Sequence, residues 1–216
     1  MTDLITESIP DLIKALGTTL LLGVASFALG FVIGGFITLA RLSRHTVLKA
    51  AAIVYVSLFR GTPLLVQIML VYFGLPQLGV RIPPIPSAIL TFTLYSAAYL
   101  SENFRSGILA IDKGQWEAAD SLGMTHGRRL RRVIFPQAVR VATPAIGGRF
   151  IALMKDTSLA SVITVVELTR VAESVGSSTF RYVEAFAMAG VVYWLINTVL
   201  SVLQEVLERR MGRAYA

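Results

Sequence analysis

The sequence predicts an all-α membrane protein with five membrane-spanning helices, and two observations support this. Of its 216 residues, 55% are hydrophobic and only 15% are charged, and the mean hydropathy is +0.68. Soluble domains carry about 25% charged residues. The charges also cluster between long uncharged runs, which favours helices that face hydrocarbon. The length suits one domain, so we treat 1–216 as a single transmembrane unit.

The five expected spans follow from the length of the apolar runs. A bilayer core of about 30 Å needs roughly 20 apolar residues in helical form. We expect spans at about 15–40, 61–80, 82–104, 144–166 and 185–204.

The fourth run is less clear, because Arg149, Lys155 and Asp156 interrupt it. We expect its helix to begin at Pro144, where the missing N–H of proline costs nothing. A soluble amphipathic helix is the alternative, but only a span lets the topology close.

The distribution of Lys and Arg predicts the orientation. Twelve of them lie in the segments expected inside, 41–49, 112–143 and after residue 204, whereas the segments expected outside hold four, namely Lys14, Arg81, Arg170 and Arg181. Basic residues accumulate on the cytoplasmic side, so the N-terminus is expected outside and the C-terminus in the cytoplasm. The net charge of +7 is therefore attributed to membrane topology and not to a nucleic-acid partner.

The longest inner segment, 112–143, predicts a short helix followed by a second, basic one. Asp112 is a favourable N-cap, and Gln115 can return the bond as in a capping box. Gly123 supplies a left-handed stop, and Thr125 can cap the next helix. The segment is therefore expected to protrude as two short helices on the cytoplasmic side.

One face of the first short helix is apolar. Trp116, Ala119 and Leu122 recur at helical spacing, which leaves Glu117 exposed. By itself this pattern also fits an ordinary surface helix that precedes a basic membrane anchor.

The spacing within this segment resembles a known motif. Glu117-Ala118-Ala119, then Gly123 and later Pro136, resembles the EAA loop of permease subunits of ATP-binding-cassette importers. The stretches RGTPLLVQ at 60–67, GQWEAADSLG…FPQAVR and KDTSL at 155–159 are similar to the polar amino-acid branch (histidine, glutamine, arginine type). In that family the loop is a coupling helix that sits in a groove of the ATPase. The resemblance assigns this role to Gln115, Glu117, Ala118, Ala119, Leu122 and Gly123.

The resemblance also implies a type I importer-like fold and a set of partners. These are a cytoplasmic ATP-binding-cassette ATPase, a second permease copy or paralogue, and an extracytoplasmic amino-acid-binding protein. ATP and Mg²⁺ would belong to the ATPase, and this chain would be a multi-pass, non-enzymatic subunit of the cell (inner) membrane. The residues agree: we find no Gly-rich phosphate loop ending in Lys-Ser or Lys-Thr, no H-E-x-x-H motif and no cysteine. No cofactor or metal is expected on this chain.

Polar residues within the apolar runs are candidates for a substrate pathway, because ionisable groups at membrane depth are costly. Asp156 lies twelve residues after Pro144, which is about 18 Å along a helix and near the middle of the membrane. Its carboxylate can receive an α-amino group, and the Ser158 hydroxyl lies nearby in sequence. The alternative is a structural pair between Asp156 and Lys155 or Arg149.

Three further candidates lie in the second and third runs. Glu102 can line the cavity, although a helix-supported pair with Arg105 explains it equally. Gln67 offers an uncharged amide one turn after Pro63, and Thr62 marks a helix start. The acidic residues Glu102 and Asp156 lean towards a cationic amino acid, but they suit any α-amino group.

Two other classes of protein share part of this pattern. A small oligomeric channel would place Asp156 in its pore, but it has no use for an inner helix of the EAA type. A membrane scaffold would keep its partner without Asp156. A membrane enzyme would need converging nucleophiles or metal ligands, and we find none in the sequence.

Overall fold

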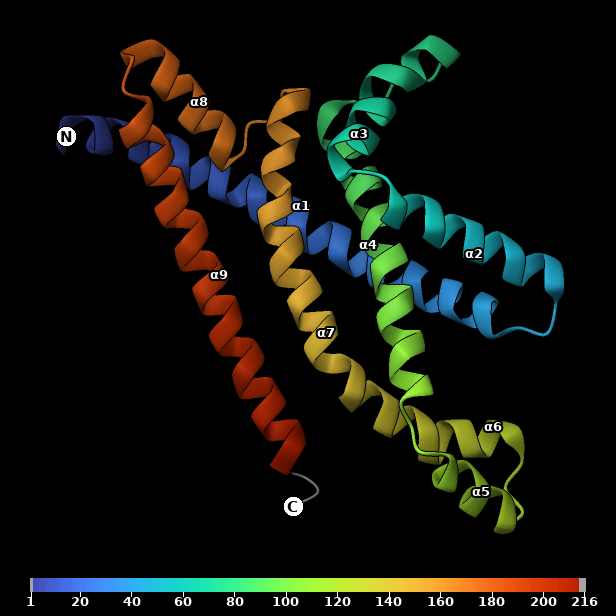
Figure 1. Cartoon of the computed structure of the whole chain (residues 1–216). Coiled ribbons are helices and arrows are strands. Elements are labelled where there is room, and N and C mark those ends of the chain that lie inside the picture. The colour runs from blue at the N-terminus through green and yellow to red at the C-terminus, as the bar shows by residue number, and fades with distance from the viewer. Residues whose placement is uncertain (1, 214–216) are drawn as a thin grey trace.

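A computed structural model describes the backbone of residues 2–213 and the side chains of residues 8–211, and every element in that part of the chain is helical (Figure 1). In chain order the elements are α1 (Thr2–Leu42), α2 (Thr46–Gly61), α3 (Leu64–Met69), η1 (Leu70–Gly74), η2 (Leu75–Leu78), α4 (Pro84–Leu109), α5 (Lys113–Ser121), α6 (His126–Arg129), η3 (Leu130–Ile134), α7 (Phe135–Asp156), η4 (Thr157–Ile163), α8 (Leu168–Thr179) and α9 (Tyr182–Arg213).

Helices α1 and α4 cross at very short range, because glycines of α1 face the backbone of α4. A Cβ atom on Gly34 would lie 3.0 Å from the carbonyl oxygen of Ala97, and one on Gly30 would lie 3.0 Å from Ser96 Cβ. Small residues four apart allow this approach between membrane helices. The Thr38 hydroxyl then donates across the crossing to the carbonyl of Ser101, at 3.0 Å. The crossing therefore fixes the C-terminal end of α1 beside α4.

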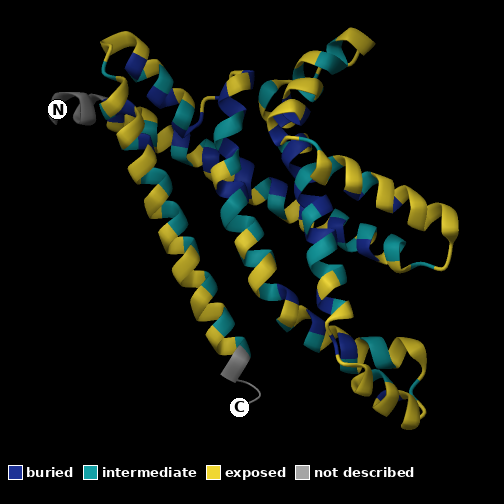
Figure 2. Ribbon diagram, viewed as in Figure 1, coloured by how far each residue is buried: buried dark blue, intermediate teal, exposed yellow. Residues whose placement is uncertain are grey.

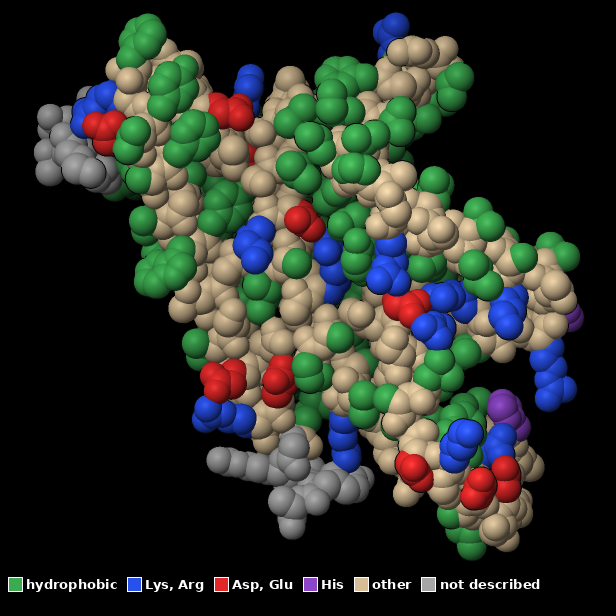
Figure 3. Space-filling model, in the orientation of Figure 1, with side chains coloured by type: hydrophobic (Ala, Val, Ile, Leu, Met, Phe, Trp, Pro, Cys, Tyr) green, Lys and Arg blue, Asp and Glu red, His purple; other side chains and the backbone are tan. Residues whose placement is uncertain are grey.

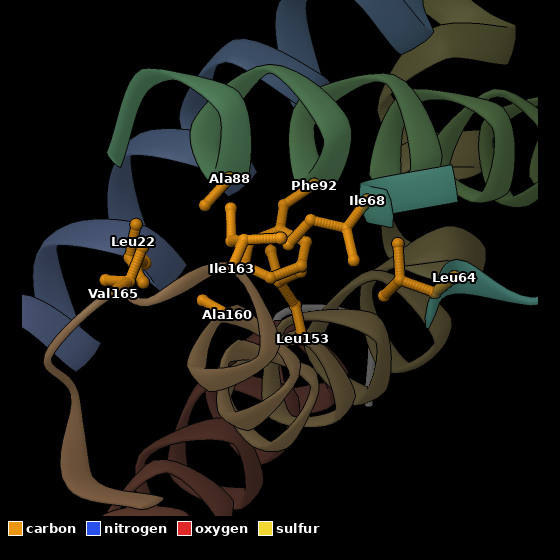
Figure 4. Close-up of a cluster of buried hydrophobic side chains, with 9 residues drawn as sticks. All are labelled: Leu22, Leu64, Ile68, Ala88, Phe92, Leu153, Ala160, Ile163 and Val165. Atoms are coloured by element: carbon orange, nitrogen blue, oxygen red, sulfur yellow. The ribbon is translucent and has the colours of Figure 1, made fainter. Parts of the chain in front are cut away.

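The main apolar core lies where five elements meet (Figure 4). Phe92 of α4 and Leu153 of α7 are fully buried within it, and the broken region after α2 contributes Ile68. Its members are Leu22, Leu64, Ile68, Ala88, Phe92, Leu153, Ala160, Ile163 and Val165. The core therefore joins α1, α3 and α4 to the end of α7.

Much of the outer surface is apolar as well; α9, which Figure 2 shows to be largely exposed, carries many exposed hydrophobic side chains. On that helix Trp194 is 65% exposed, and on α1 Phe36 is 67% exposed. By length and composition, two helices of the described chain can cross a membrane, Ser8–Leu42 and Tyr182–Met211, or three if a bent pair forms one span. The apolar exterior agrees with lipid contact, and the count of five spans stays a prediction.

The predicted second span, 61–80, is not one straight helix. The chain turns by 104° between α2 and the helical run from Leu64 to Leu78. Thr62 and Pro63 are extended at this break, since proline disfavours a helical conformation in the residue before it. The predicted helix start near Thr62 is confirmed, but a helix also precedes it.

The predicted helix start at Pro144 is wrong, whereas the bounds of the fourth span stay a prediction. Helix α7 begins at Phe135 with Pro136 in its first turn, and Pro144 lies inside it. The chain is already helical from α6 through the π-helical turn η3 into α7, so Pro136 and Pro144 both lie within a continuous helical run and neither begins it. Asp156 is the last residue of α7, and the 18 Å offset from Pro144 therefore no longer locates it in the membrane.

Helix α8 is held against its neighbours by a buried carboxylate. Glu167 caps the helix by accepting from the backbone N–H groups of Thr169 and Arg170, at 2.9 and 2.8 Å. The Tyr193 hydroxyl of α9 donates to the same carboxylate at 2.7 Å. The cap thus joins the start of α8 to α9.

Candidate functional site

Helix α5 protrudes at one end of the molecule, and its capping is largely as predicted (Figure 1). The Asp112 carboxylate accepts from the Gly114 N–H at 2.7 Å, and Gly123 has the left-handed φ of 68° that ends the turn. The predicted return bond from Gln115 is wrong, because its oxygen instead accepts from Gln137 of α7, at 3.1 Å. Gln115 therefore links α5 to α7.

The inner side of α5 is fastened to the helices beside it. Ala119 is buried, and Trp116 packs against a small cluster around Ile134 and Ala138. The guanidinium of Arg129 stacks over the Trp116 ring at 5.1 Å and forms an ion pair with Asp120. These contacts join α5 to α6 and to the start of α7.

The outer side of α5 is uncovered. Gln115, Glu117, Ala118 and Gly123 are exposed, and the Leu122 side chain is 76% exposed. The prediction that Leu122 shares one face of the helix with Trp116 and Ala119 is wrong, since α5 ends at Ser121 and Leu122 lies beyond it. The predicted coupling residues therefore divide into an exposed surface and the inward-facing Ala119.

A second group of charges surrounds Glu102. Figure 3 shows several basic and acidic side chains near the middle of the face that it draws. The predicted pair with Arg105 is present, with Nε 3.2 Å from the carboxylate. Arg41 of α1 also ion-pairs with Glu102, and Arg60 of α2 lies 3.9 Å away. We call these four residues the Glu102 cluster. It joins three helices, which favours the structural explanation for Glu102 over a place in the pathway.

Asp156 is paired as well, but less completely. Arg149 donates to its carboxylate at 2.8 Å, so of the two alternatives for a structural pair the one with Arg149 forms. The guanidinium lies over the rings of Tyr95 and Tyr99, at 4.8 and 4.9 Å from their centroids. The side chain of Asp156 remains 30% exposed and that of Arg149 only 9%. The Arg149 guanidinium is thus held by two tyrosine rings, and the Asp156 carboxylate that it pairs with remains partly exposed.

The remaining predicted pathway residues bond to their own surroundings. Gln67 is buried, and its amide nitrogen donates to Thr62 Oγ1 at 2.8 Å and to the Phe59 carbonyl at 2.9 Å. The Ser158 hydroxyl donates to the carbonyl of Lys155 at 2.8 Å. Gln67 and Thr62 therefore stabilise the break after α2, and their described hydrogen bonds do not reach Asp156.

The sequence interpretation missed Tyr95 and Tyr99, which hold Arg149, and Arg41, which reaches Glu102. A signal was present, because Tyr95, Tyr99 and Glu102 recur at helical spacing and share a face of α4. The contribution of Arg41 could not be found this way, since it depends on how α1 crosses α4.

Comparison with known proteins agrees with this arrangement. The family of binding-protein-dependent transport system inner membrane components matches residues 26–213. The chain belongs to this family. It is therefore a multi-pass permease subunit of the cell (inner) membrane, a kind of subunit that is not itself the ATPase.

The similar proteins are transport system permeases, and the similar solved structures are transporters. The chain is 43% identical to the L-cystine transport system permease protein TcyB of Bacillus subtilis (strain 168), over 99% of this chain and 92% of that one. It is 39% identical to the glutamine transport system permease protein GlnP of Escherichia coli (strain K12), over 94% of each. A structure described as an amino acid ABC transporter with histidines superposes with a TM-score of 0.92 at 39% identity, over 95% of this chain and 96% of that one. The MetNI methionine transporter, at 20% identity and a TM-score of 0.77 over 93% and 95%, supports the fold alone.

Proposed function

We propose that this chain is the membrane-spanning subunit of an ATP-driven importer that moves a polar amino acid inward. The proposal rests on one observation: the outer side of α5 is exposed, while its inner side packs against α6 and the start of α7. Relatives named for transport of L-cystine and of glutamine support the substrate class.

The proposed partners follow from this assignment. A cytoplasmic ATPase subunit, which holds ATP and Mg²⁺, docks on the outer side of α5 through Glu117, Ala118 and Leu122. A second permease copy or a paralogue covers the face that carries Asp156, and an extracytoplasmic binding protein delivers the amino acid. We place the N-terminus outside and α5 in the cytoplasm, with five spans, because the bias of Lys and Arg supports that orientation.

The proposed mechanism is transmission of a rigid-body motion. Closure of the ATPase dimer displaces α5, and Arg129 and Trp116 pass the displacement to the start of α7. Because Asp156 is the last residue of α7, the same motion changes the surroundings of the carboxylate that receives the amino group of the substrate. Helix α7 thereby links the substrate site at Asp156 to the ATPase subunit that docks on α5.

The docking role is tested by co-purification of the permease with its ATPase and by ATP hydrolysis of the complex. Glu117→Arg reverses an exposed charge, and Gly123→Asp places a side chain at a left-handed position on the docking surface. We expect both to lose most ATPase binding and stimulated hydrolysis.

The control is Glu173→Arg, a charge reversal on α8 at the opposite end of the molecule, where the Glu173 side chain is 38% exposed (Figure 1). It should bind the ATPase normally. The docking assignment is wrong if Glu117→Arg and Gly123→Asp, eluting as folded protein in size-exclusion chromatography, bind and stimulate the ATPase as well as this control.

A further inference from the structure

The arginines around Asp156 and Glu102 bear on the charge of the amino acid that is carried, an inference that rests on the proposed function. The Asp156 pair and the Glu102 cluster are connected through one aromatic ring. Arg149 lies 4.9 Å and Arg60 lies 5.1 Å from the centroid of the Tyr99 ring. The connected group contains four arginines, Arg41, Arg60, Arg105 and Arg149, but only two carboxylates, Glu102 and Asp156.

We propose that this face selects amino acids of net zero or negative charge and discriminates against basic ones. In the proposed complex Asp156 receives the α-ammonium group and Arg149 receives the α-carboxylate. The zwitterion thus inserts into an ion pair that has the same two charges. A basic side chain would add a third charge where cations are already in excess.

Arg149 has the capacity for such a ligand. A guanidinium carries five N–H donors in a planar fork, which matches a carboxylate. The structure gives it one hydrogen bond, to Asp156, and leaves its buried Nε without a partner in the described chain. The rings of Tyr95 and Tyr99 hold the group in place, so its orientation need not be fixed by Asp156 alone.

Glu102 cannot serve as a second acidic subsite. Its carboxylate already lies against Arg41 and Arg105 and within 3.9 Å of Arg60. A lysine or arginine substrate would have to displace one of these guanidinium groups and would approach an excess of positive charge. Charges interact more strongly in a medium of low effective dielectric constant, so this repulsion is not screened as it is in water. The leaning towards a cationic substrate that the two acidic residues suggest is therefore reversed.

The experiment measures binding to the purified permease–ATPase complex in detergent without the binding protein, because that protein selects substrates on its own. Labelled glutamine, glutamate, arginine and lysine are the probes. We expect glutamine or glutamate to bind at least about tenfold more tightly than arginine and lysine, which corresponds to the contribution of one charge-assisted contact.

Two variants then separate the role of Arg149 from a general effect of charge. Arg149→Gln removes the cation that pairs with Asp156 and should reverse the preference, so that arginine and lysine bind better than glutamine. Arg60→Gln removes an equal charge from the same group, but Arg60 lies beside Glu102 instead of Asp156, so this variant should narrow the preference without reversing it. If Arg149→Gln does not elute as a folded complex, Arg149→Lys keeps the charge and should keep the order while weakening glutamine binding.

The outcomes distinguish the two proposals. Tighter binding of arginine or lysine than of glutamine and glutamate by the wild-type complex overturns the charge selection but leaves an amino-acid importer in place. Reversal of the preference by Arg60→Gln to the same degree as by Arg149→Gln overturns the specific role of Arg149. If none of the four probes binds, while the complex hydrolyses ATP, the substrate class of the proposed function falls together with this inference.

Discussion

Glu102 and Asp156 are both carboxylates beside apolar helices, but the structure surrounds them differently. Glu102 contacts guanidinium groups from α1, α2 and α4, and its side chain is 19% exposed. Asp156 contacts one guanidinium and is 30% exposed. The first arrangement fixes three helices relative to one another, whereas the second leaves room for a ligand. The number of arginines per carboxylate thus separates a structural group from a candidate binding group.

The comparison of Glu102 with Asp156 predicts that loss of the Glu102 carboxylate lowers the stability of the protein the most. Glu102→Ala leaves Arg41 and Arg105 without their carboxylate and should destabilise the protein by roughly 2–3 kcal/mol, below the value for a fully buried pair because the groups keep some access to solvent. Thermal unfolding in detergent measures the change.

Glu205→Ala is the control for this substitution, since its pair with Arg209 on α9 is exposed. It should shift the unfolding midpoint by little, because exposed helix pairs contribute only about 0.3–0.5 kcal/mol. Equal midpoints for Glu102→Ala and Glu205→Ala would show that the Glu102 cluster does not hold the helices together.

The second effect concerns the crossing that delivers Arg41 to Glu102. Gly34→Ala places a methyl group 3.0 Å from the Ala97 carbonyl oxygen and should cost roughly 1–3 kcal/mol, as overpacking does. Gly35→Ala is a matched control, because a Cβ atom there meets no atom within 4 Å. The same unfolding measurement decides, and a control as damaging as Gly34→Ala would rule out close packing as the cause.

The third effect is on transport rather than on stability. Asp156→Ala should lower uptake by reconstituted importer vesicles at least about tenfold, because an ionic hydrogen bond to the amino group is lost. Its unfolding midpoint should fall less than that of Glu102→Ala, since only one guanidinium loses its partner. Uptake at the wild-type rate and with unchanged selectivity would remove Asp156 from the pathway.

The sequence was sufficient for the helical class, the family and the ends of α5, because each depends on local patterns. Asp112 and Gly123 act within a few residues of themselves, and their roles were predicted correctly. The start of α7 was missed because Pro144 fits a first helical turn by its local pattern, whereas the helical run that begins at His126 continues through both Pro136 and Pro144.

The arrangement of charges was harder to predict because it is not local. Arg41 and Glu102 are 61 residues apart in the chain and meet only because of the glycine-lined crossing of α1 and α4. Arg149 was recognised as one possible partner of Asp156, but the two tyrosines that hold it lie on another helix. The sequence therefore suggested a cationic substrate, whereas the positions of the arginines favour the opposite.

Glu167 extends the comparison to a carboxylate that forms no ion pair with an arginine side chain in the described part of the chain, and it gives the smallest predicted effect. Burial raises the pKa of Glu167, although the Thr169 and Arg170 N–H groups and the Tyr193 hydroxyl oppose the shift. The folded protein then binds a proton that the unfolded chain releases near pH 4.5, so stability falls as the pH rises from there to the raised pKa. Thermal unfolding midpoints measured across this interval should decline.

Glu167→Gln should flatten this decline, because the amide does not titrate yet still offers one oxygen to the hydrogen-bond donors around it. Glu173→Gln, an exposed substitution on the same helix, should keep the wild-type slope. A slope that survives Glu167→Gln would assign the pH dependence to another group. A slope lost only in Glu167→Gln would assign the pH dependence to the carboxylate that joins α8 to α9. Its burial without a guanidinium partner would then lower stability as the pH rises, a loss that the three arginines around Glu102 prevent in the Glu102 cluster.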